Sequence, residues 1–596
     1  MNKILSTLDW SIIIAYFIFA FSIALYVAKK SSESVGSYFT ASRSLPWWMV
    51  GTSMVATTFA ADTPLAIAGI VATQGIAGNW FWWSWALSTI AIVVFFSKRW
   101  FRSKIVTDAQ FITIRYRGKE AQVLRSIKAV FYGVIINCFI LGWVLRAMSK
   151  IASIFLHWNK ILTPTTWLWL QTHWPKWLMY GTVNDSLSIV LILFFVMVYC
   201  SLGGIRSVIL TDIFQFVLAM GSSILFSIIA LKHVGGILPL IQGLSNSGFT
   251  KNLNFFPSFS GLFPFQLFCI WIFGTWWIQH FADGGGYVAQ RISCSRSEKD
   301  ASLGTLWFAI ANFVFRSWPW IIVGLVILIY PFGTSSSALL ATDPELGYPM
   351  LMRELLPSGL LGLVFASLLA AFMSTVDTHL NWGASYLIND LYQKLRPKAK
   401  TPELIWISRL SVIILAILAI IMSTHITSIA AAWKYVLALG AGLGFATLAR
   451  WFWWRVNAYT EIAGMITALL SCLIIPWLIP SITSDYLMLY SAFISTIICL
   501  IVILYTTNNK KQKHLVSFIK QIKPLGFWGN YYSKKESAKA IQEFYSSLKT
   551  WLLGSLSIYG LLFGLGFIIF QNYFVGIINL LIGIFCLSKV LKSITN

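Results

Sequence analysis

Residues 46–72 read PWWMVGTSMVATTFAADTPLAIAGIVA, an apolar run interrupted by glycines, by Pro64 and by a small polar stretch around Asp62. About 20 apolar residues suffice to cross the hydrocarbon core of a membrane, so this run is long enough to span it. Proline and glycine weaken a helix, and non-helical backbone is tolerated inside a bilayer only where it lines a cavity. The stretch therefore predicts a membrane span that is broken near its middle, beside a binding site.

The composition of the whole chain indicates the same environment. Of the 596 residues, 58% are hydrophobic and only 11% are charged, whereas charged residues make up about a quarter of an ordinary soluble protein. The mean hydropathy is +0.75. These values exclude a soluble protein. The net charge of +24 is spread between apolar runs, which excludes a nucleic-acid binder that would gather it on one face.

Apolar runs of spanning length recur along the chain, and we count about 15 of them. They predict an all-α polytopic membrane protein. The run that follows residue 263 ends in Asp283-Gly-Gly-Gly, so a second interrupted run opens a second block of five spans. Paired interruptions of this kind are typical of transporters with inverted repeats. We therefore predict the following order: a leading transmembrane helix (1–30), a first five-helix repeat (46–231), an inverted second repeat (263–455), two trailing helices (459–506), a basic cytoplasmic linker (507–549) and a C-terminal helix pair (550–593).

Lysine and arginine fall mainly in alternate loops, with the richest stretches at 98–119 and 510–549. Cytoplasmic loops collect these residues. We therefore expect a multi-pass protein of the plasma membrane with its N-terminus outside and its C-terminus inside. For residues 507–549 a solvated connector is favoured over an amphipathic helix that touches anionic lipid.

Ionisable residues inside membrane spans are costly, so each one raises a functional question. The sequence AAFMSTVDTHLN at 370–381 places Asp377 and Thr378 three and four residues after Ser374, on one face of a helix. Hydroxyl, carboxylate and carbonyl oxygens are the ligands that a hard cation prefers, and a bound cation would relieve the repulsion between buried carboxylates. The ionisable residues within predicted spans are Asp62, Asp212, His280, Asp283, Arg316, Asp377 and His379.

Three stretches resemble the sodium:solute symporter family. GGIRSVILTDIFQ at 203–215 is similar to the family's Gly-Gly signature with its Thr-Asp pair, GGGYVAQR at 284–291 to its Tyr-x-x-Gln-Arg exit from the sixth core helix, and the stretch at 370–381 to its sodium-binding helix. The likeness covers about the first 510 residues. It implies ten core helices in two inverted repeats of five.

The resemblance also implies cation ligands. The family's main sodium site carries over to backbone carbonyls at Ala56, Phe59 and Ala371 and to the hydroxyls of Ser374 and Thr375. A second cation site, found in some members, carries over to Asp212, Ser374, Asp377 and Thr378. Where those members have a hydroxyl this chain has Asp377, which would either strengthen cation binding or carry a proton in place of the second ion. For Asp212 a purely structural role is an equal alternative.

The resemblance places the solute between the two broken helices, which makes Thr58, Asp62, Thr63, Gln279 and Asp283 the candidate solute ligands. Asp62 could hold an amine through charge, beside aromatic rings, or could cap the half-helix that follows it. His280 is expected to be a satisfied hydrogen-bonding group, and Arg316 has no evident partner.

The stretch NWFWWSW at 79–85 stands where sugar-carrying members have an acidic residue and amides, so a sugar site of that kind is not expected. For its tryptophans an interface belt is favoured over an aromatic wall of the solute site.

These features together predict a sodium-coupled symporter that imports a small organic solute by alternating access. A transporter-like sensory receptor and a proton-coupled symporter are the alternatives. We expect no enzymatic activity, because the sequence has neither a nucleophile–base pair nor a metal-cluster spacing. The expected partners are the solute, sodium ions as the coupling ion and the lipid bilayer, with no organic cofactor and no nucleic acid.

Overall fold

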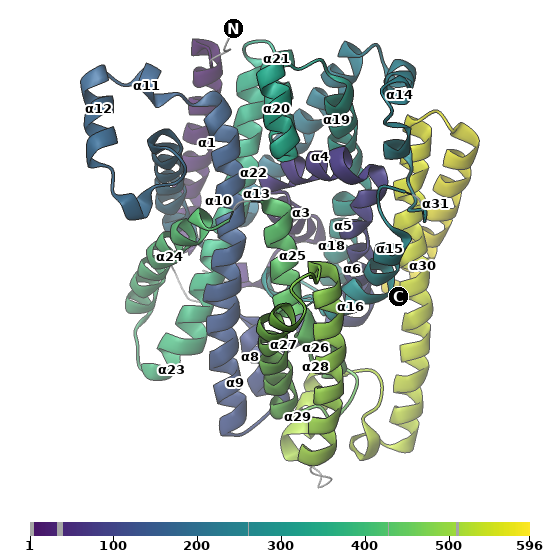
Figure 1. The fold of residues 1–596 in the computed structure, drawn as a ribbon. Coiled ribbons are helices and arrows are strands. Elements are labelled where there is room, and N and C mark those ends of the chain that lie inside the picture. The colour runs from purple at the N-terminus through teal and green to yellow at the C-terminus, as the bar shows by residue number, and fades with distance from the viewer. Residues whose placement is uncertain are drawn as a thin grey trace.

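The computed structural model describes residues 5–31, 40–259, 261–279, 281–426, 428–507 and 512–595. These residues form helices and connecting loops, and within them β-structure is limited to isolated bridges. Figure 1 shows most of the long helices side by side, running between two opposite ends of the molecule. The predicted all-α fold class is confirmed.

Eleven helical segments of the described chain are long and apolar enough to cross a membrane. Five of these segments contain short irregular turns and are divided into several elements, and the others are single helices. They are Ile76–Ser103 (with η2 Ile76–Asn79, α5 Trp80–Trp83, α6 Trp85–Ala91, η3 Ile92–Phe96 and α7 Ser97–Ser103), Lys119–Phe155 (with α9 Lys119–Val130, η4 Phe131–Ile136 and α10 Asn137–Phe155), Ile205–His233, Glu298–Ile329 (with α18 Glu298–Ile310, η8 Ala311–Phe315 and α19 Ser317–Ile329), Leu360–Leu395 (with α22 Leu360–Tyr386, η10 Leu387–Tyr392 and α23 Gln393–Leu395), α24 Thr401–Thr424, Ile429–Ala449 (with α25 Ile429–Gly440, η11 Ala441–Leu443 and α26 Gly444–Ala449), α27 Ala458–Leu478, α28 Ser484–Thr506, α30 Lys534–Ile569 and α31 Tyr573–Thr595.

The expected span count is therefore not confirmed in full. One bent pair of helices would be a twelfth span, and three predicted runs appear as shorter apolar helices, Thr7–Ile23, Val183–Val198 and Phe265–Ile278. Thr7–Ile23 belongs to α1 (Thr7–Ser31), and Val183–Val198 belongs to α13 (Val183–His233).

The connections contain further short helices, several of which lie at the ends of the molecule (Figure 1). They are η1 Ala41–Arg43, α8 Asp108–Arg115, α11 Trp158–Ile161, α12 Pro164–His173, η5 Lys176–Leu178, α14 Ile237–Asn246, η6 Thr250–Leu253, α20 Thr334–Thr342, η9 Pro344–Leu346, α21 Gly347–Leu355, α29 Lys513–Ile522 and η12 Gly529–Tyr531.

The first predicted interruption is a bent pair, α3 (Trp47–Thr58) and α4 (Asp62–Gln74), with 58° between the two helices. Pro64 explains the break, because a proline in a continuous helix would clash with the carbonyl of Ala60, four residues earlier. In the first turn of a new helix the missing N–H of proline costs nothing. The chain therefore leaves the helical conformation at Phe59 and starts again at Asp62.

The second interruption separates α15 (Phe265–Ile270), η7 (Trp271–Thr275) and α16 (Trp276–Ile278) from α17 (Tyr287–Cys294). The glycines at its end are required by the backbone, since Gly284 has φ +81° and Gly286 has φ +67°. Only glycine adopts such values without strain. Both interruptions that the sequence indicated are thus present in the structure.

Helix α13 (Val183–His233) combines two predicted runs in one helical segment of 51 residues. Two ring contacts show that it is not straight: Phe195 packs on Phe17 and Phe214 on Phe19, each with 4.3 Å between the ring centroids. In a straight helix residues 195 and 214 would lie about 28 Å apart, yet their partners are two residues apart in α1 (Thr7–Ser31). The segment therefore turns back on itself between these residues.

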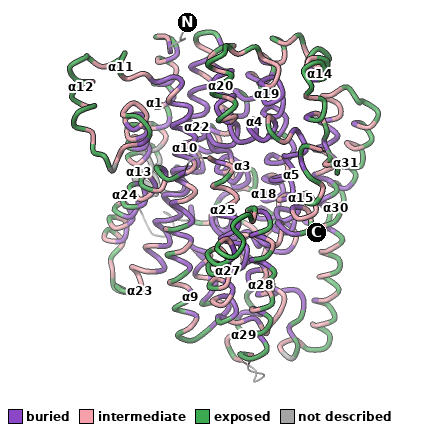
Figure 2. The backbone as a smooth tube through the Cα atoms, viewed as in Figure 1, coloured by how far each residue is buried: buried purple, intermediate pink, exposed green. Residues whose placement is uncertain are grey.

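Helix α22 lies at the centre of the bundle, and every residue from Leu361 to Tyr386 except Leu363 is buried. Figure 2 shows the burial concentrated in this inner layer, with exposed backbone at α12, α23 and α29. The start of α22 is held by α1, because the Asp9 carboxylate accepts hydrogen bonds from the N–H groups of Gly359 (2.8 Å) and Gly362 (2.7 Å). A carboxylate at a helix N-terminus is stabilising.

The C-terminal part differs from the expected solvated linker and helix pair. Helix α29 buries Leu515, Phe518, Ile519 and Ile522 against the bundle. Helix α30 begins at Lys534, so residues 534–549 continue into the membrane-crossing helix without a boundary at 549. The physical reason is the amphipathic spacing of the apolar residues in 515–522, which covers an apolar face of the bundle.

Candidate functional site

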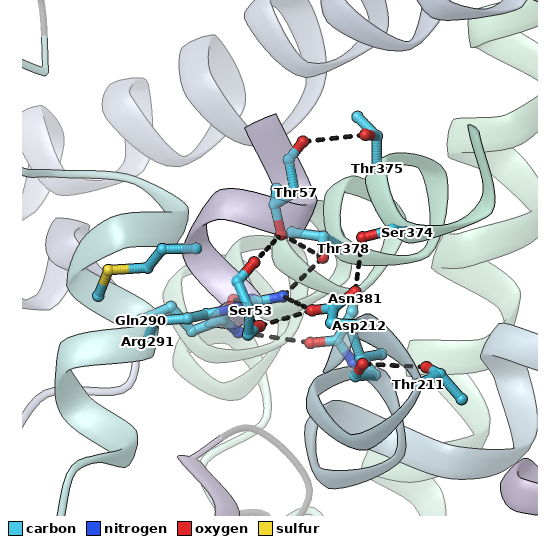
Figure 3. Close-up of polar contacts among 12 residues, drawn as sticks. Ser53, Thr57, Thr211, Asp212, Gln290, Arg291, Ser374, Thr375, Thr378 and Asn381 are labelled. Carbon is cyan, nitrogen blue, oxygen red and sulfur yellow. Dashed lines mark hydrogen bonds and ion pairs between the residues drawn. The ribbon is translucent and has the colours of Figure 1, made fainter. Parts of the chain in front are cut away.

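The broken end of α3 lies directly against the middle of α22. The Thr375 hydroxyl donates to the carbonyl of Thr57 at 2.9 Å, and the carbonyl oxygen of Ala371 lies 3.3 Å from the same hydroxyl oxygen. One turn further along α22, the hydroxyl oxygens of Thr57 and Thr378 are 3.1 Å apart. Figure 3 shows these side chains facing one another across the two helices. Hydroxyl and carbonyl oxygens thus converge at the point where α3 is broken.

All five residues expected at the main sodium site are buried in this region. The carbonyl of Ala56 accepts the N–H of Phe59 at 3.1 Å, in the last turn before the break. The Ser374 hydroxyl donates to Asp212 at 2.6 Å, which leaves its lone pairs available. The donor set of carbonyls and hydroxyls is of the kind that a hard monovalent cation binds. The ligand assignment itself stays a prediction.

Asp212 is fully buried and lies at the centre of a polar cluster (Figure 3). Its carboxylate accepts hydrogen bonds from the hydroxyls of Ser53 (2.5 Å) and Ser374 (2.6 Å). Arg291 faces it with 3.7 Å between Nη2 and Oδ2. The same guanidinium donates to Thr378 at 2.6 Å and to Ser53 at 3.1 Å. Asp212 therefore joins α3, α13, α17 and α22, and the proposed second cation site already contains a cation of the protein.

Asp377 lies in α22, like Ser374 and Thr378, and is fully buried. Its carboxylate and that of Asp212 both interact electrostatically with the phenol of Tyr16 in α1. Tyr16 in turn accepts a hydrogen bond from Gln215 at 2.9 Å. The four residues predicted for the second site thus lie within one buried neighbourhood, and their role as ligands stays a prediction.

Sequence reasoning missed two members of this cluster, Ser53 and Arg291. Ser53 lies three residues before Ala56, so helical spacing could have placed it on the same face. Arg291 belongs to the quoted 284–291 stretch, but the sequence analysis gave it no role. It is instead completely buried.

A cavity of about 250 Å³ opens beside the broken end of α3. Four of the five predicted solute ligands line it: Thr58, Asp62, Thr63 and Gln279. His280 lies outside the described residues. The remaining lining residues come from several helices, chiefly α6, α10, α17, η8, α22 and α25, and from the loops beside them. Among them are Trp82, Trp85, Ser88, Thr89, Trp143, Phe281, Tyr287, Asn312, Arg316, Thr375, His379 and Trp433.

Asp62 occupies the first position of α4, and no side-chain capping bond is present at that helix start. Its carboxylate instead accepts hydrogen bonds from the indole N–H of Trp433 at 3.1 Å and from the hydroxyl of Thr63 at 3.3 Å. The capping interpretation is therefore wrong in its detail, although a carboxylate in the first turn is still favoured by the helix dipole.

The tryptophans of residues 79–85 do not form an interface belt. Trp80, Trp82 and Trp83 are each at most 4% exposed, and Trp82 and Trp85 line the cavity. The belt interpretation is wrong because distant segments cover this stretch: the Tyr559 hydroxyl of α30 donates to the carbonyl of Trp83 at 3.1 Å. Such coverage cannot be inferred from local composition.

Asp283 does not line the cavity. Its carboxylate forms an ion pair with Arg450 (2.7 Å) and accepts a hydrogen bond from the indole of Trp451 (2.8 Å). Arg450 also pairs with Glu461 at 3.3 Å, and Glu461 pairs with Lys128. The structure thus places Asp283 in a buried network that joins the second interruption to α9, α26 and α27.

We predict that Asp283→Asn destabilises the protein by about 1–3 kcal/mol, because Arg450 loses a charged partner in a buried place. The solute concentration that gives half-maximal uptake should remain unchanged. Thermal unfolding in detergent and an uptake titration measure the two quantities. A large change in solute affinity with unchanged stability would instead assign Asp283 to the solute site.

Comparisons with known proteins bear on the family and the fold of the chain. Residues 38–141 and 180–468 match the family model described as the sodium:solute symporter family. The chain is 24% identical over 454 residues to mouse sodium/glucose cotransporter 4, covering 70% of this chain and 60% of that protein. It is 24% identical over 534 residues to a sodium/glucose cotransporter of Vibrio parahaemolyticus, covering 85% of this chain and 92% of that protein.

A solved structure of a Na⁺-coupled sialic acid symporter in a substrate-bound outward-open state has a TM-score of 0.67 to this chain. The sequence identity is 17%, and the alignment covers 85% of this chain and 99% of that one. At this identity the likeness shows the fold alone.

Proposed function

Because the chain belongs to the sodium:solute symporter family, we propose that it is a sodium-coupled secondary active transporter for a small organic solute. The observation that carries this proposal is the contact between the broken end of α3 and α22, where the Thr375 hydroxyl binds the carbonyl of Thr57 at 2.9 Å. This contact brings loosened backbone and hydroxyl oxygens together beside a cavity. A cation bound there would touch both helices, so that its binding is coupled to their relative position.

The ligands that we propose for the main sodium ion are the carbonyls of Ala56, Phe59 and Ala371 and the hydroxyls of Ser374 and Thr375. Each sodium ion that enters down a membrane potential contributes about 2.3 kcal/mol per 100 mV. Since about 1.4 kcal/mol corresponds to a factor of ten, one ion supports roughly forty-fold accumulation of the solute at that potential. The number of coupled ions therefore determines how far the solute is concentrated.

The described chain is an integral membrane protein. We place it in the plasma membrane, with the N-terminus outside and the C-terminus inside. Two features support this orientation. The basic segments at α9, α23 and α29 share one end of the molecule (Figure 1). Lys98, at the start of the basic 98–119 stretch, donates to the carbonyl of Ile594 at 3.4 Å, so the C-terminus lies beside that stretch. The proposal includes no enzymatic step and no organic cofactor.

Uptake into proteoliposomes tests the proposed function. The purified chain should accumulate a labelled solute when an inward sodium gradient is imposed, and accumulation should stop when potassium replaces sodium. A transporter-like receptor would bind solute without accumulation, and a proton-coupled symporter would respond to a pH gradient in the absence of sodium. Either of those results would overturn the proposal.

We predict that Asp377→Asn raises the sodium concentration needed for half-maximal uptake and lowers the number of charges moved per solute. The neutral amide removes a buried negative charge from the neighbourhood of Asp212, so a second cation would be bound less tightly. Sodium titrations of uptake and of transport current measure both effects. Asp485→Asn, which alters an ion pair with Lys434, is the matched control. If Asp377→Asn changes neither quantity, the second cation site does not exist.

A further inference from the structure

The cavity contains one acidic and one basic side chain that form no close ion pair among the described residues and interact electrostatically with one another only at longer range. Asp62 is 3% exposed and Arg316 is 4% exposed, and both line the cavity. Neither takes part in any ion pair found among the described residues. Buried charges are normally paired, because removal from water costs several kcal/mol per ion. Two opposite charges are thus held apart at the edge of one small space.

Arg316 is fixed in position but retains donor capacity. Its guanidinium carbon lies 5.7 Å from the ring centre of Trp82 and 5.3 Å from that of Trp320. Nη1 donates to the Thr58 hydroxyl at 3.1 Å, whereas the buried Nε has no hydrogen-bond partner among the residues that the structure describes. A guanidinium has five N–H donors in a planar fork that matches a carboxylate. The group therefore lines the cavity with donors to spare for an oxyanion.

Asp62 is similarly fixed, by the hydrogen bonds from Trp433 and Thr63. Both donors are neutral, and the interaction with Arg316 is longer than a close ion pair, so the carboxylate can still take a cationic group in direct contact. Aromatic side chains from several helices surround the same cavity. An ammonium group is attracted both to a carboxylate and to the faces of such rings.

Several other polar side chains of the cavity already have hydrogen-bond partners within the protein. Gln279 donates to Ser88 at 2.7 Å, and Ser88 donates to the carbonyl of Trp85 at 2.9 Å. Thr89 donates to that carbonyl as well, at 3.0 Å. His379 pairs with Asn137 at 2.7 Å. A solute with many hydroxyls would have to disrupt these contacts, whereas the charges of Asp62 and Arg316 remain available without rearrangement.

From these observations we propose that the transported solute is a small zwitterion, such as an amino acid or a betaine, with its carboxylate at Arg316 and its cationic nitrogen at Asp62. The inference rests on the proposed function. A zwitterion balances both buried charges, whereas a simple cation or anion leaves one of them uncompensated. The cavity of about 250 Å³ lies below the usual range of roughly 300–1,000 Å³ for ligand pockets, which suits a solute of this size.

Thermal unfolding of the full chain, purified in detergent, tests the inference. The shift in unfolding temperature caused by each probe is measured in sodium chloride and, for comparison, in potassium chloride. The probes are the standard amino acids and glycine betaine, together with two monopolar forms of each amino acid that binds. These forms are its amide, which is cationic, and its N-acetyl derivative, which is anionic. Glucose and sialic acid are added as sugars without and with a carboxylate. We expect sodium-dependent stabilisation by at least one zwitterion and by neither of its monopolar forms.

Two charge-neutralising variants make the test specific. Arg316→Gln should weaken binding of the zwitterion at least tenfold and shift the preference toward its amide, because only Asp62 remains charged. Asp62→Asn should shift the preference toward the N-acetyl acid. The matched controls Arg146→Gln and Asp485→Asn alter polar contacts outside the cavity and should leave the preference unchanged. A merely structural role would weaken all probes alike, without opposite shifts.

The outcomes separate this inference from the proposed function. Stabilisation by glucose or sialic acid and by no zwitterion would overturn the zwitterion assignment and leave sodium-coupled transport intact. Stabilisation by sodium alone, without any effect of a zwitterion, would overturn it as well. The absence of any effect of sodium, with or without solute, would count against the proposed function itself.

Discussion

Replacement of Arg291 by methionine is expected to lower the free energy of unfolding by about 3–5 kcal/mol, which is the usual cost of removing one partner of a buried ion pair and leaving the other charge uncompensated. Asp212 would remain in the interior without its cation, with only the hydroxyls of Ser53 and Ser374 as donors. Thr378 would also lose the donor at 2.6 Å. Because these residues belong to four different helices, the loss should affect the whole bundle. Denaturant titration of the purified protein in detergent, followed by tryptophan fluorescence, measures the effect.

A second variant shows whether the ion pair is responsible. Asp212→Asn in the Arg291→Met background should recover much of the lost stability, because it removes the unpaired charge. Arg353→Met, which breaks a surface ion pair with Glu354, should change stability by less than about 1 kcal/mol. If Arg291→Met costs no more than this control, the guanidinium does not hold Asp212 in place.

Removal of the two hydroxyls of α22 at the cation site should have the largest effect on sodium dependence. Thr375→Val keeps the shape of the side chain but removes the oxygen that contacts the carbonyls of Thr57 and Ala371. Ser374→Ala removes the oxygen bonded to Asp212. We expect each variant to raise the sodium concentration for half-maximal uptake about tenfold, which corresponds to about 1.4 kcal/mol. The double variant should have no sodium activation.

Matched controls exist close by. Ser367 lies two turns earlier in α22 and donates only to the carbonyl of Val364. Thr305 of α18 donates only to the carbonyl of Ala301. Both hydroxyls are buried and bind their own helix, so Ser367→Ala and Thr305→Val should leave sodium activation unchanged. An equal loss in these controls would attribute the effect to general destabilisation of the spans.

Local chemistry explains what could be predicted from the sequence. Pro64 breaks a helix wherever it stands, and Gly284 and Gly286 permit the backbone of the second interruption, so both broken spans were visible in the sequence. The residues around Ser374 sit at helical spacing, which correctly placed them on one buried helix. Fold class and the neighbourhood of the cation site follow from such short-range signals.

The remaining features depend on contacts between distant segments. Trp83 is covered by Tyr559, which lies 476 residues later in the chain, so composition around residue 83 could not distinguish a buried wall from a membrane belt. Arg316 contacts Thr58 across 258 residues, and Asp283 meets Arg450 across 167. Only the folded structure shows that the first of these arginines lines the cavity while the second is paired with Asp283.

Direct binding of radioactive sodium to the purified protein is the most direct test of the central claim, that a cation is bound between the broken end of α3 and α22. The account predicts saturable binding by the unmodified chain and by Ser367→Ala, and no saturable binding by the Ser374→Ala/Thr375→Val double variant. Equal binding by the double variant and the unmodified chain would contradict the account, because the ion would then be held elsewhere.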